Sequence, residues 1–201
     1  MNLFDKGKQI VLQAPQLYID VDVETDGWAG HGSMLSLGAV APEGQTFYSE
    51  IKPLFEEYVP HQRKFCETHG LERTRLLNEA PAYNEVMARF ADWVDELSLS
   101  YDKPPVFTAF NAGFDFGFVQ LYYLKAGLPN PFAAAPFDLK SLAMAVNPEW
   151  DWSLTGKSQL PSQVLPDGDF THHALEDAIY QQKLHFGLAG LLGSSQQKSV
   201  I

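Results

Sequence analysis

The segment LYIDVDVETDG, residues 17–27, alternates apolar and polar side chains until it reaches a glycine. Leu, Ile and Val occupy its odd positions, which is the pattern of a β-strand that buries one face. The acidic residues Asp20, Asp22 and Glu24 therefore share the opposite face. Carboxylates placed this close repel one another unless cations neutralise them, and hard divalent ions such as Mg²⁺ prefer oxygen ligands. The segment is thus either part of a metal site or an acidic strand end exposed to solvent.

The segments around this strand predict an α/β fold. Alternating apolar and polar residues predict two more strands after the first, and these three strands are expected to form an antiparallel meander. Helices and short apolar strands follow along the chain. The expected strands cover residues 17–23, 34–41, 46–51 and 106–110, with a short strand and a helix within 137–145. The other expected helices cover residues 61–77 with a break near Gly70, 82–97, 115–126 and 173–192. This order predicts a mixed sheet of about five strands covered by helices.

Length and composition predict one intracellular domain. A chain of 201 residues suits a single domain, expected at residues 17–192 between a flexible arm at 1–16 and a loose tail at 193–201. The first residues are too polar for a signal peptide and no apolar stretch could cross a membrane, so the cytoplasm is the expected location. The single cysteine, Cys66, excludes a disulfide framework and a cysteine-rich zinc site.

The formal net charge of −11 bears on the partners of the protein. Non-specific affinity for nucleic acid comes mainly from Lys and Arg on phosphates, so a protein that holds nucleic acid by broad electrostatics is not expected. An enzyme that recruits divalent cations is still compatible with this charge, since the cations would meet the phosphate. A small basic cluster, formed by Arg63, Lys64, Arg73 and Arg75, is either a phosphate track or a solvated helix face.

Two further motifs place acidic residues or histidine at the ends of expected elements. In FNAGFDFGFV, residues 110–119, Asp115 stands at the start of a helix, where an acid also serves as an ordinary helix-terminal residue. In THHALEDAIY, residues 171–180, His172 precedes Asp177 by five residues. If His172 lies in the loop before the helix, its ring can reach a site lined by Asp177; two solvated histidines at a helix start are the alternative. Together, the three motifs favour a common site.

The ordered set of motifs resembles the DEDD exonuclease superfamily, in the DEDDh subclass that has a histidine in its third motif and includes ribonuclease T and the proofreading subunit of DNA polymerase III. The first motif matches at residues 22–25, the second at 111–115 and the third at 172–178. The resemblance extends over residues 17 to about 186, including MLSLGAV and THGLERTRLLNEAP. It implies a ribonuclease-H-like fold and a 3′→5′ exonuclease with a histidine general base and two divalent cations, Mg²⁺ with Mn²⁺ as a substitute.

The family pattern also implies a role for each motif residue. Asp22, Glu24 and Asp177 would bind the first metal ion, Asp22 would bridge to the second, and Asp115 would contribute directly or through water. His172 would take the proton from the attacking water. The chemistry requires such groups, because two divalent ions can serve both the attacking and the leaving oxygen of a phosphodiester and a histidine can accept a proton near neutral pH.

Three residues depart from this pattern or add to it. Asp26 precedes Gly27 where a small or neutral residue is more usual, which puts the geometry of that loop in question. Asp20 has no counterpart in the motif, and we expect it to make a structural hydrogen bond. His173 is the alternative general base if the ring of His172 turns away from the site.

Substrate contacts are expected beside the first two motifs. Trp28 follows the first motif in a glycine-bearing loop, where an exposed aromatic ring could stack on a base. Backbone amides from Thr25 onward could bind the terminal sugar hydroxyl. Asn111 and Phe114 of the second motif complete the expected contacts, although core packing is the alternative role for Phe114.

The leading prediction is an exonuclease that releases nucleoside 5′-monophosphates from the 3′ ends of single-stranded RNA or DNA. The alternatives are an oligoribonuclease-like phosphodiesterase for small substrates, a binding module without turnover on a nuclease fold, and a structural cation site. The choice between RNA and DNA depends on contact with the 2′-hydroxyl, which the sequence does not locate. A homodimer is one expected arrangement, because a partner subunit could supply basic residues that this chain lacks.

Overall fold

A five-stranded sheet forms the centre of the protein in a computed structural model that describes residues 1–132, 135–146, 151–153, 156, 159–168 and 170–196. Its strands stand in the order β3-β2-β1-β4-β5. The strands are β1 (Leu17–Thr25), β2 (Met34–Val40), β3 (Thr46–Glu50), β4 (Pro105–Ala109) and β5 (Phe137–Asp138). The first three pair antiparallel, β4 runs parallel to β1, and β5 runs parallel to β4. The predicted mixed sheet with an initial meander is confirmed.

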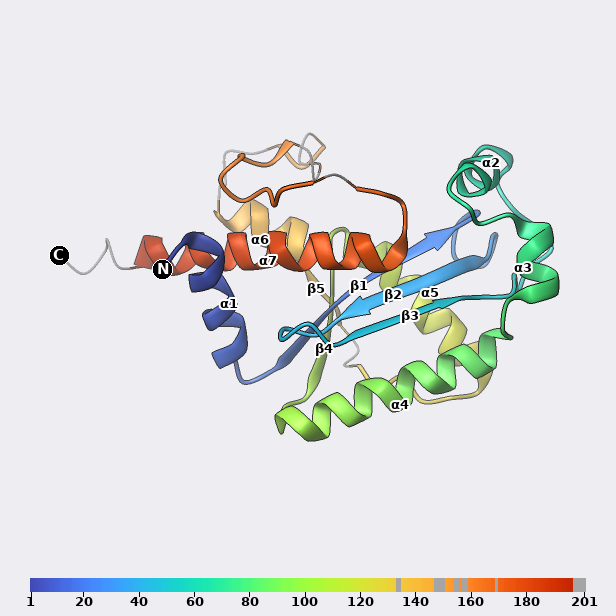
Figure 1. Cartoon of the computed structure of the whole chain (residues 1–201), viewed down its shortest axis with the longest axis horizontal. Helices are drawn as coiled ribbons and strands as arrows, with labels where there is room; N and C mark the ends of the chain where they lie inside the picture. The colour runs from blue at the N-terminus through green and yellow to red at the C-terminus, as the bar shows by residue number, and fades with distance from the viewer. Residues whose placement is uncertain (133–134, 147–150, 154–155, 157–158, 169, 197–201) are drawn as a thin grey trace.

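Helices cover both faces of the sheet (Figure 1). The helix α7 crosses one face, with α1 and α6 beside it, while α4 and α5 pack on the other face. The short helices α2 and α3 lie at the end of the molecule away from both chain termini. The helix bounds are α1 Leu3–Gln13, α2 Pro60–Thr68, α3 Arg73–Glu79, α4 Tyr83–Tyr101, α5 Ala112–Ala126, α6 Leu139–Val146 and α7 Ala174–Gln196.

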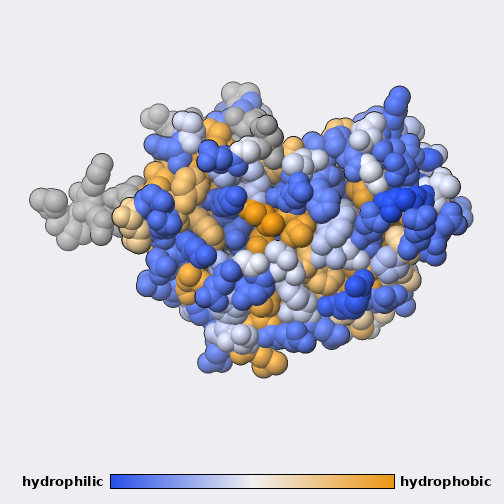
Figure 2. All heavy atoms as spheres, in the orientation of Figure 1, coloured by the Kyte–Doolittle hydropathy of each residue, from blue (hydrophilic) through white to orange (hydrophobic). Residues whose placement is uncertain are grey.

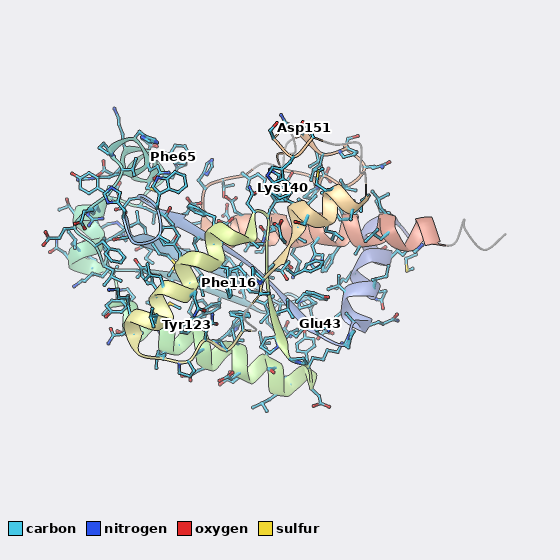
Figure 3. The ribbon with its side chains drawn as sticks, turned by 180° about the vertical axis from the view of Figure 1, so that it is seen from behind. Glu43, Phe65, Phe116, Tyr123, Lys140 and Asp151 are labelled. Atoms are coloured by element: carbon cyan, nitrogen blue, oxygen red, sulfur yellow. The ribbon has the colours of Figure 1, made fainter. Side chains whose placement is uncertain are left out.

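The two faces of β1 have different environments, as its alternating sequence predicts. Its odd-numbered residues, such as Ile19 and Val21, are fully buried in the main hydrophobic core with residues of α4 and α5. In the same core Tyr123 of α5 stacks on Phe90 of α4, and Figure 3 shows Tyr123 between these two helices. Each large side chain buried in this way contributes about 1.5–3 kcal/mol. The even-numbered residues of β1 therefore face α7, where the third motif lies.

The expectation of a flexible arm at residues 1–16 is wrong. Most of this segment forms α1, whose first turn is capped where the Asn2 side chain accepts a hydrogen bond of 2.8 Å from the Asp5 amide. The helix packs closely on α7, because a Cβ at Gly7 would lie only 1.6 Å from the Phe186 carbonyl oxygen. Val11 is buried at the same contact.

The remaining differences concern element ends. The helix expected at 61–77 is two helices, α2 and α3, separated around Gly70 as the sequence indicated. The helix α7 continues to Gln196, so it includes the beginning of the expected loose tail; residues 197–201 lie outside the described residues. Part of the irregular segment expected between 147 and 169 also lies outside them.

None of the described helices combines the length and the apolar character that a membrane span requires. On the face of the molecule in Figure 2, hydrophilic residues predominate and apolar atoms gather near the middle.

Gly38 allows α7 to approach the sheet beside the first motif. It pairs with Asp22 across β1 and β2, and a Cβ at this position would lie 2.2 Å from the Ala174 carbonyl carbon at the start of α7. Substituting Gly38→Ala should therefore force the helix away from the sheet and lower the free energy of unfolding by about 1–3 kcal/mol. Urea denaturation measures this loss.

Gly117 provides a matched control for this prediction. It lies inside α5, and nothing lies within 4 Å of the Cβ that alanine would add. Because alanine favours a helix more than glycine does, Gly117→Ala should unfold at the same or a higher urea concentration than the wild type. A Gly38→Ala variant with the wild-type midpoint would show that the close approach does not constrain α7.

Candidate active site

A pocket of about 420 Å³ lies where the three motifs meet. The described residues that line it include all five motif residues, namely Asp22, Glu24, Asp115, His172 and Asp177. Asn111 and Phe114 line the same pocket, and so do Phe110 and Phe170, whose place in the pocket the sequence motifs do not indicate. A larger cavity of about 900 Å³ lies between α1 and α7, but its lining is mainly apolar and contains none of the predicted site residues. The smaller pocket is therefore the candidate site.

The carboxylates of the first motif lie where β1 separates from β4. The two strands pair from Leu17 opposite Pro105 to Asp20 opposite Thr108, and β1 then continues to Thr25. Asp22 and Glu24 come just after this separation and are half-buried. The antiparallel pairing with β2 continues on the other side, so this part of β1 stays a regular strand as far as the irregularity between Glu24 and Thr25. The pocket thus opens in a gap of the sheet, on a rigid strand.

Asp115 connects the second motif to the first. It is buried in the first turn of α5, which follows Asn111 in the left-handed conformation. Its Oδ1 accepts a hydrogen bond of 3.2 Å from the Val23 amide, 92 residues away in the chain. The pairing of β1 with β4 ends at Asp20, so the Val23 amide has no partner on β4. The Asp115 carboxylate accepts the hydrogen bond from this amide instead. This bond places Asp115 beside Asp22 and Glu24.

Backbone amides hold Asp177 of the third motif in place. The Thr171 amide donates to Oδ1 at 2.8 Å and the His172 amide donates to Oδ2 at 3.1 Å. His172 has a φ of 57°, so the turn before α7 passes through the left-handed region that side chains other than glycine rarely adopt. The strained turn wraps the backbone around the Asp177 carboxylate, and His172 lies in the loop before the helix, as expected.

Glu24, His172 and Asp177 could share one metal ion. Each offers a ligand atom, and these atoms all lie within 4.8 Å of one another. Asp22 and Asp115 line the same pocket, whereas no Lys or Arg is among its described lining residues. A cluster of carboxylates with so little local positive charge has the oxygen donors that Mg²⁺ and Mn²⁺ prefer. The residues therefore fit divalent cations.

The two neighbouring histidines have different surroundings. The His172 ring lies edge-on to Phe65 of α2, with 4.5 Å between ring centroids, and its centroid is 4.9 Å from that of the His69 ring. The ring of His173 instead stacks on Tyr48 of β3 at 4.4 Å. Since His172 lines the pocket and His173 does not, the geometry favours His172 over His173 as the histidine of the site.

The expected substrate contacts divide into two groups. Trp28 is 58% exposed and stands edge-on to Phe114, a residue of the pocket lining, with ring centroids 6.0 Å apart. Asn111 is also exposed. Thr25 is buried, and its hydroxyl donates a hydrogen bond of 3.1 Å to the Gly27 carbonyl. The Thr25 side chain thus stabilises the loop after β1 and is not part of the described pocket lining.

The arginines of the basic cluster are engaged in ion pairs. Arg75 binds both carboxylate oxygens of Glu50 at 2.7 Å, and Arg63 binds Glu67 at 2.8 Å. Arg73 is buried and pairs with Asp26. These contacts do not support a phosphate track formed by the cluster.

Asp26 and Asp20, which the motif comparison left without a role, are both buried and hydrogen-bonded within the structure. Asp26 is fully buried, and it accepts a hydrogen bond of 2.6 Å from the Ser33 amide in addition to its pair with Arg73. It thereby closes the loop that carries Trp28. The structural hydrogen bond expected of Asp20 is present, because its Oδ2 lies 3.4 Å from Nδ1 of the buried His185.

Comparison with known protein families points to nucleases. The model of the 3′-5′ exoribonuclease Rv2179c-like domain matches residues 17–186. The chain is 35% identical to the 3′-5′ DNA exonuclease Cap18 of Escherichia coli over 172 residues, which are 84% of this chain and 89% of that protein.

Solved structures show the same fold. The nuclease domain of 3′hExo, a DEDDh family member bound to rAMP, aligns with a TM-score of 0.66 at 12% identity and covers 90% of this chain and 94% of that domain. Pop2p of S. pombe in its Mg²⁺- and Mn²⁺-bound form aligns with a TM-score of 0.57 at 12% identity, covering 91% of this chain and 87% of that one. The predicted ribonuclease-H-like fold is therefore confirmed.

Proposed function

The chain belongs to the family of the 3′-5′ exoribonuclease Rv2179c-like domain, and from this membership we propose that it shortens single-stranded nucleic acid from the 3′ end and releases nucleoside 5′-monophosphates. It is a metal-dependent 3′→5′ exonuclease of the DEDDh type. The observation that carries the proposal is the meeting of Asp22, Glu24, Asp115, His172 and Asp177 in one pocket. These residues come from β1, α5 and the segment that spans the loop before α7 and its first turn, which only the fold brings together.

The carboxylates of the pocket would hold two divalent cations, Mg²⁺ or Mn²⁺. Asp22, Glu24 and Asp177 are suited to the first cation, and Asp22 together with Asp115 to the second. Two such cations supply an activated water and stabilise the charge on the attacking and leaving oxygens. The backbone bonds to Asp115 and Asp177 fix these carboxylates before the cations bind, so little reorganisation is needed.

His172 acts as the general base. Its ring lies among the carboxylates, and a nitrogen of the ring accepts the proton of the attacking water. The rings of Phe65 and His69 pack against it and limit its rotation. Phe65 and His69 thus orient the base without taking part in the chemistry.

Different observations bear on whether the substrate is RNA or DNA and on how long it is. The matching family model describes an exoribonuclease and the relative Cap18 is a DNA exonuclease, so both RNA and DNA are substrates to test. The absence of Lys and Arg from the described pocket lining and the net charge of −11 favour short single-stranded ends over long duplexes. A homodimer that supplies basic residues stays a prediction, which sedimentation would test.

Trp28 should stack on a base near the 3′ end. Base stacking on an aromatic side chain contributes about 1–3 kcal/mol, so Trp28→Ala should raise KM roughly 5- to 150-fold with little change in kcat. Steady-state kinetics on a single-stranded oligonucleotide measure this effect. Trp152→Ala is the matched control, because Trp152 is 53% exposed but lies against Lys140 of α6. Equal effects of the two substitutions would contradict a stacking role for Trp28.

A gel assay tests the proposed reaction. RNA and DNA single strands labelled at the 5′ end are incubated with Mg²⁺, with Mn²⁺ or with EDTA. The proposal predicts a ladder that shortens from the 3′ end only with metal, and the preferred sugar follows from the two rates. Internal cleavage, or shortening that persists in EDTA, would contradict it. Activity confined to dinucleotides would favour the oligoribonuclease-like alternative.

A further inference from the structure

The gap between β1 and β4 is bridged by a side chain that belongs to neither strand. Nε2 of Gln181 donates hydrogen bonds to the Val21 carbonyl at 3.1 Å and to the Thr108 carbonyl at 3.3 Å. Its Oε1 accepts a bond of 2.8 Å from the Phe110 amide. Gln181 is 1% exposed. Its amide thus continues the ladder just beyond the last pair of the two strands, Asp20 and Thr108.

Two of the three partners of Gln181, Val21 and Phe110, adjoin a motif. Val21 immediately precedes Asp22 on β1, and Phe110 immediately precedes Asn111, where the segment that carries Asp115 begins. Gln181 itself lies one helical turn after Asp177 on α7, so both side chains project from the same face of that helix. One buried amide therefore connects the three segments that supply the carboxylates of the pocket.

We infer that Gln181 is a positioning residue, which sets the spacing of the carboxylates by fixing β1, the start of α5 and α7 relative to one another. The inference rests on the proposed function. The hydrogen bond from the Val23 amide to Asp115 lies two residues farther along β1, closer to the pocket, and also bridges β1 to the second-motif segment. Without the Gln181 amide, buried backbone groups of Val21, Thr108 and Phe110 would lose hydrogen-bond partners. The distance between β1 and β4 would then no longer be fixed beside the pocket.

The adjacent residue offers a matched control. Gln182 is also buried, and its Nε2 donates to the Val40 carbonyl at 3.4 Å and to the Ala41 carbonyl at 2.9 Å. Both residues thus connect α7 to the backbone of the sheet through an amide. The bonds of Gln182 go to the end of β2 that lies away from the motifs, so its loss should weaken the fold without changing the pocket.

The test compares Gln181→Met with Gln182→Met, because methionine keeps the length of the side chain and removes the amide. Three quantities are measured for each variant: the urea midpoint in EDTA, the affinity for Mn²⁺ by titration of the free ion, and kcat and KM on a single-stranded oligonucleotide. Loss of a group that orients metal ligands typically lowers metal affinity or activity about 10- to 100-fold. We expect this loss in Mn²⁺ affinity and in kcat for Gln181→Met, with KM within about twofold, and near wild-type values for Gln182→Met.

Wild-type Mn²⁺ affinity and kcat in Gln181→Met would overturn the inference, and so would equal losses in both variants, since these would reflect stability alone. If Gln181→Met does not fold, Gln181→Asn takes its place, because it keeps an amide on a shorter side chain. Full Mn²⁺ affinity and kcat in a folded Gln181→Asn would likewise overturn the inference. The Mn²⁺ titration tests Gln181 even if the wild type degrades no nucleic acid, an outcome that would contradict the proposed function instead.

Discussion

Replacing Asp22 by asparagine should reduce exonuclease activity by more than about a hundredfold. Loss of a group that merely orients a metal ligand already costs about 10- to 100-fold, and Asp22 is the ligand we expect both cations to share. Asparagine has nearly the same shape, so the loss would reflect the missing charge. Single-turnover rates at saturating Mg²⁺ measure the effect. Glu96→Gln, on the exposed face of α4, removes one charge far from the pocket and should leave the rate unchanged.

Although Asp22→Asn should lower activity, it should not lower thermal stability when metal is removed. Without cations the pocket holds carboxylates with no Lys or Arg in its described lining, and they repel one another. In EDTA the variant should therefore unfold at the same or a higher temperature than the wild type. Mn²⁺ should stabilise the wild type more than the variant, because a ligand stabilises the state that binds it. An inactive variant that is also less stable in EDTA would indicate a folding defect instead.

Replacing His172 by glutamine should lower kcat by about 10²–10⁴-fold and leave KM nearly unchanged, as expected for loss of a general base. Mn²⁺ affinity distinguishes a base from a ligand, because a ring nitrogen of His172 lies within 4.8 Å of a carboxylate oxygen of Glu24 and of Asp177 and could bind the same ion. A general base that does not bind metal predicts retained affinity. Initial rates and Mn²⁺ titrations on the same preparation give both answers.

His173→Gln is the control for this variant, because the His173 ring stacks on Tyr48 outside the pocket lining. It should retain most of the wild-type kcat. A large loss in His173→Gln with little loss in His172→Gln would reverse the assignment of the base. A large loss of Mn²⁺ affinity in His172→Gln would make His172 a metal ligand.

The sheet and the motif residues were predictable from the sequence because their signals are local. The alternation in β1 specifies which face is buried, and it placed Asp22 and Glu24 on the face that meets α7. Glycine and proline marked several element ends, such as the break near Gly70. The end of a strand and the start of a helix then indicated where side chains could meet.

The features that the sequence did not reveal depend on contacts between distant segments. Five of the eleven residues of α1 are apolar, and its packing on α7 shows which of them form a buried face. Nothing local indicates that Phe65 of α2 reaches His172, or that Gln181 binds backbone groups 160 and 73 residues away. A buried glutamine in a helix resembles an exposed one in the sequence, so such positioning residues are found only in the structure.

The most direct measurement is anomalous diffraction from crystals grown with Mn²⁺ and a nucleoside 5′-monophosphate. The two-cation site predicts two peaks roughly 3.5–4 Å apart, one among Asp22, Glu24 and Asp177 and one between Asp22 and Asp115, with the phosphate against both. A single peak held by Glu24, His172 and Asp177, with the nucleotide bound elsewhere, would contradict it and indicate a structural cation site.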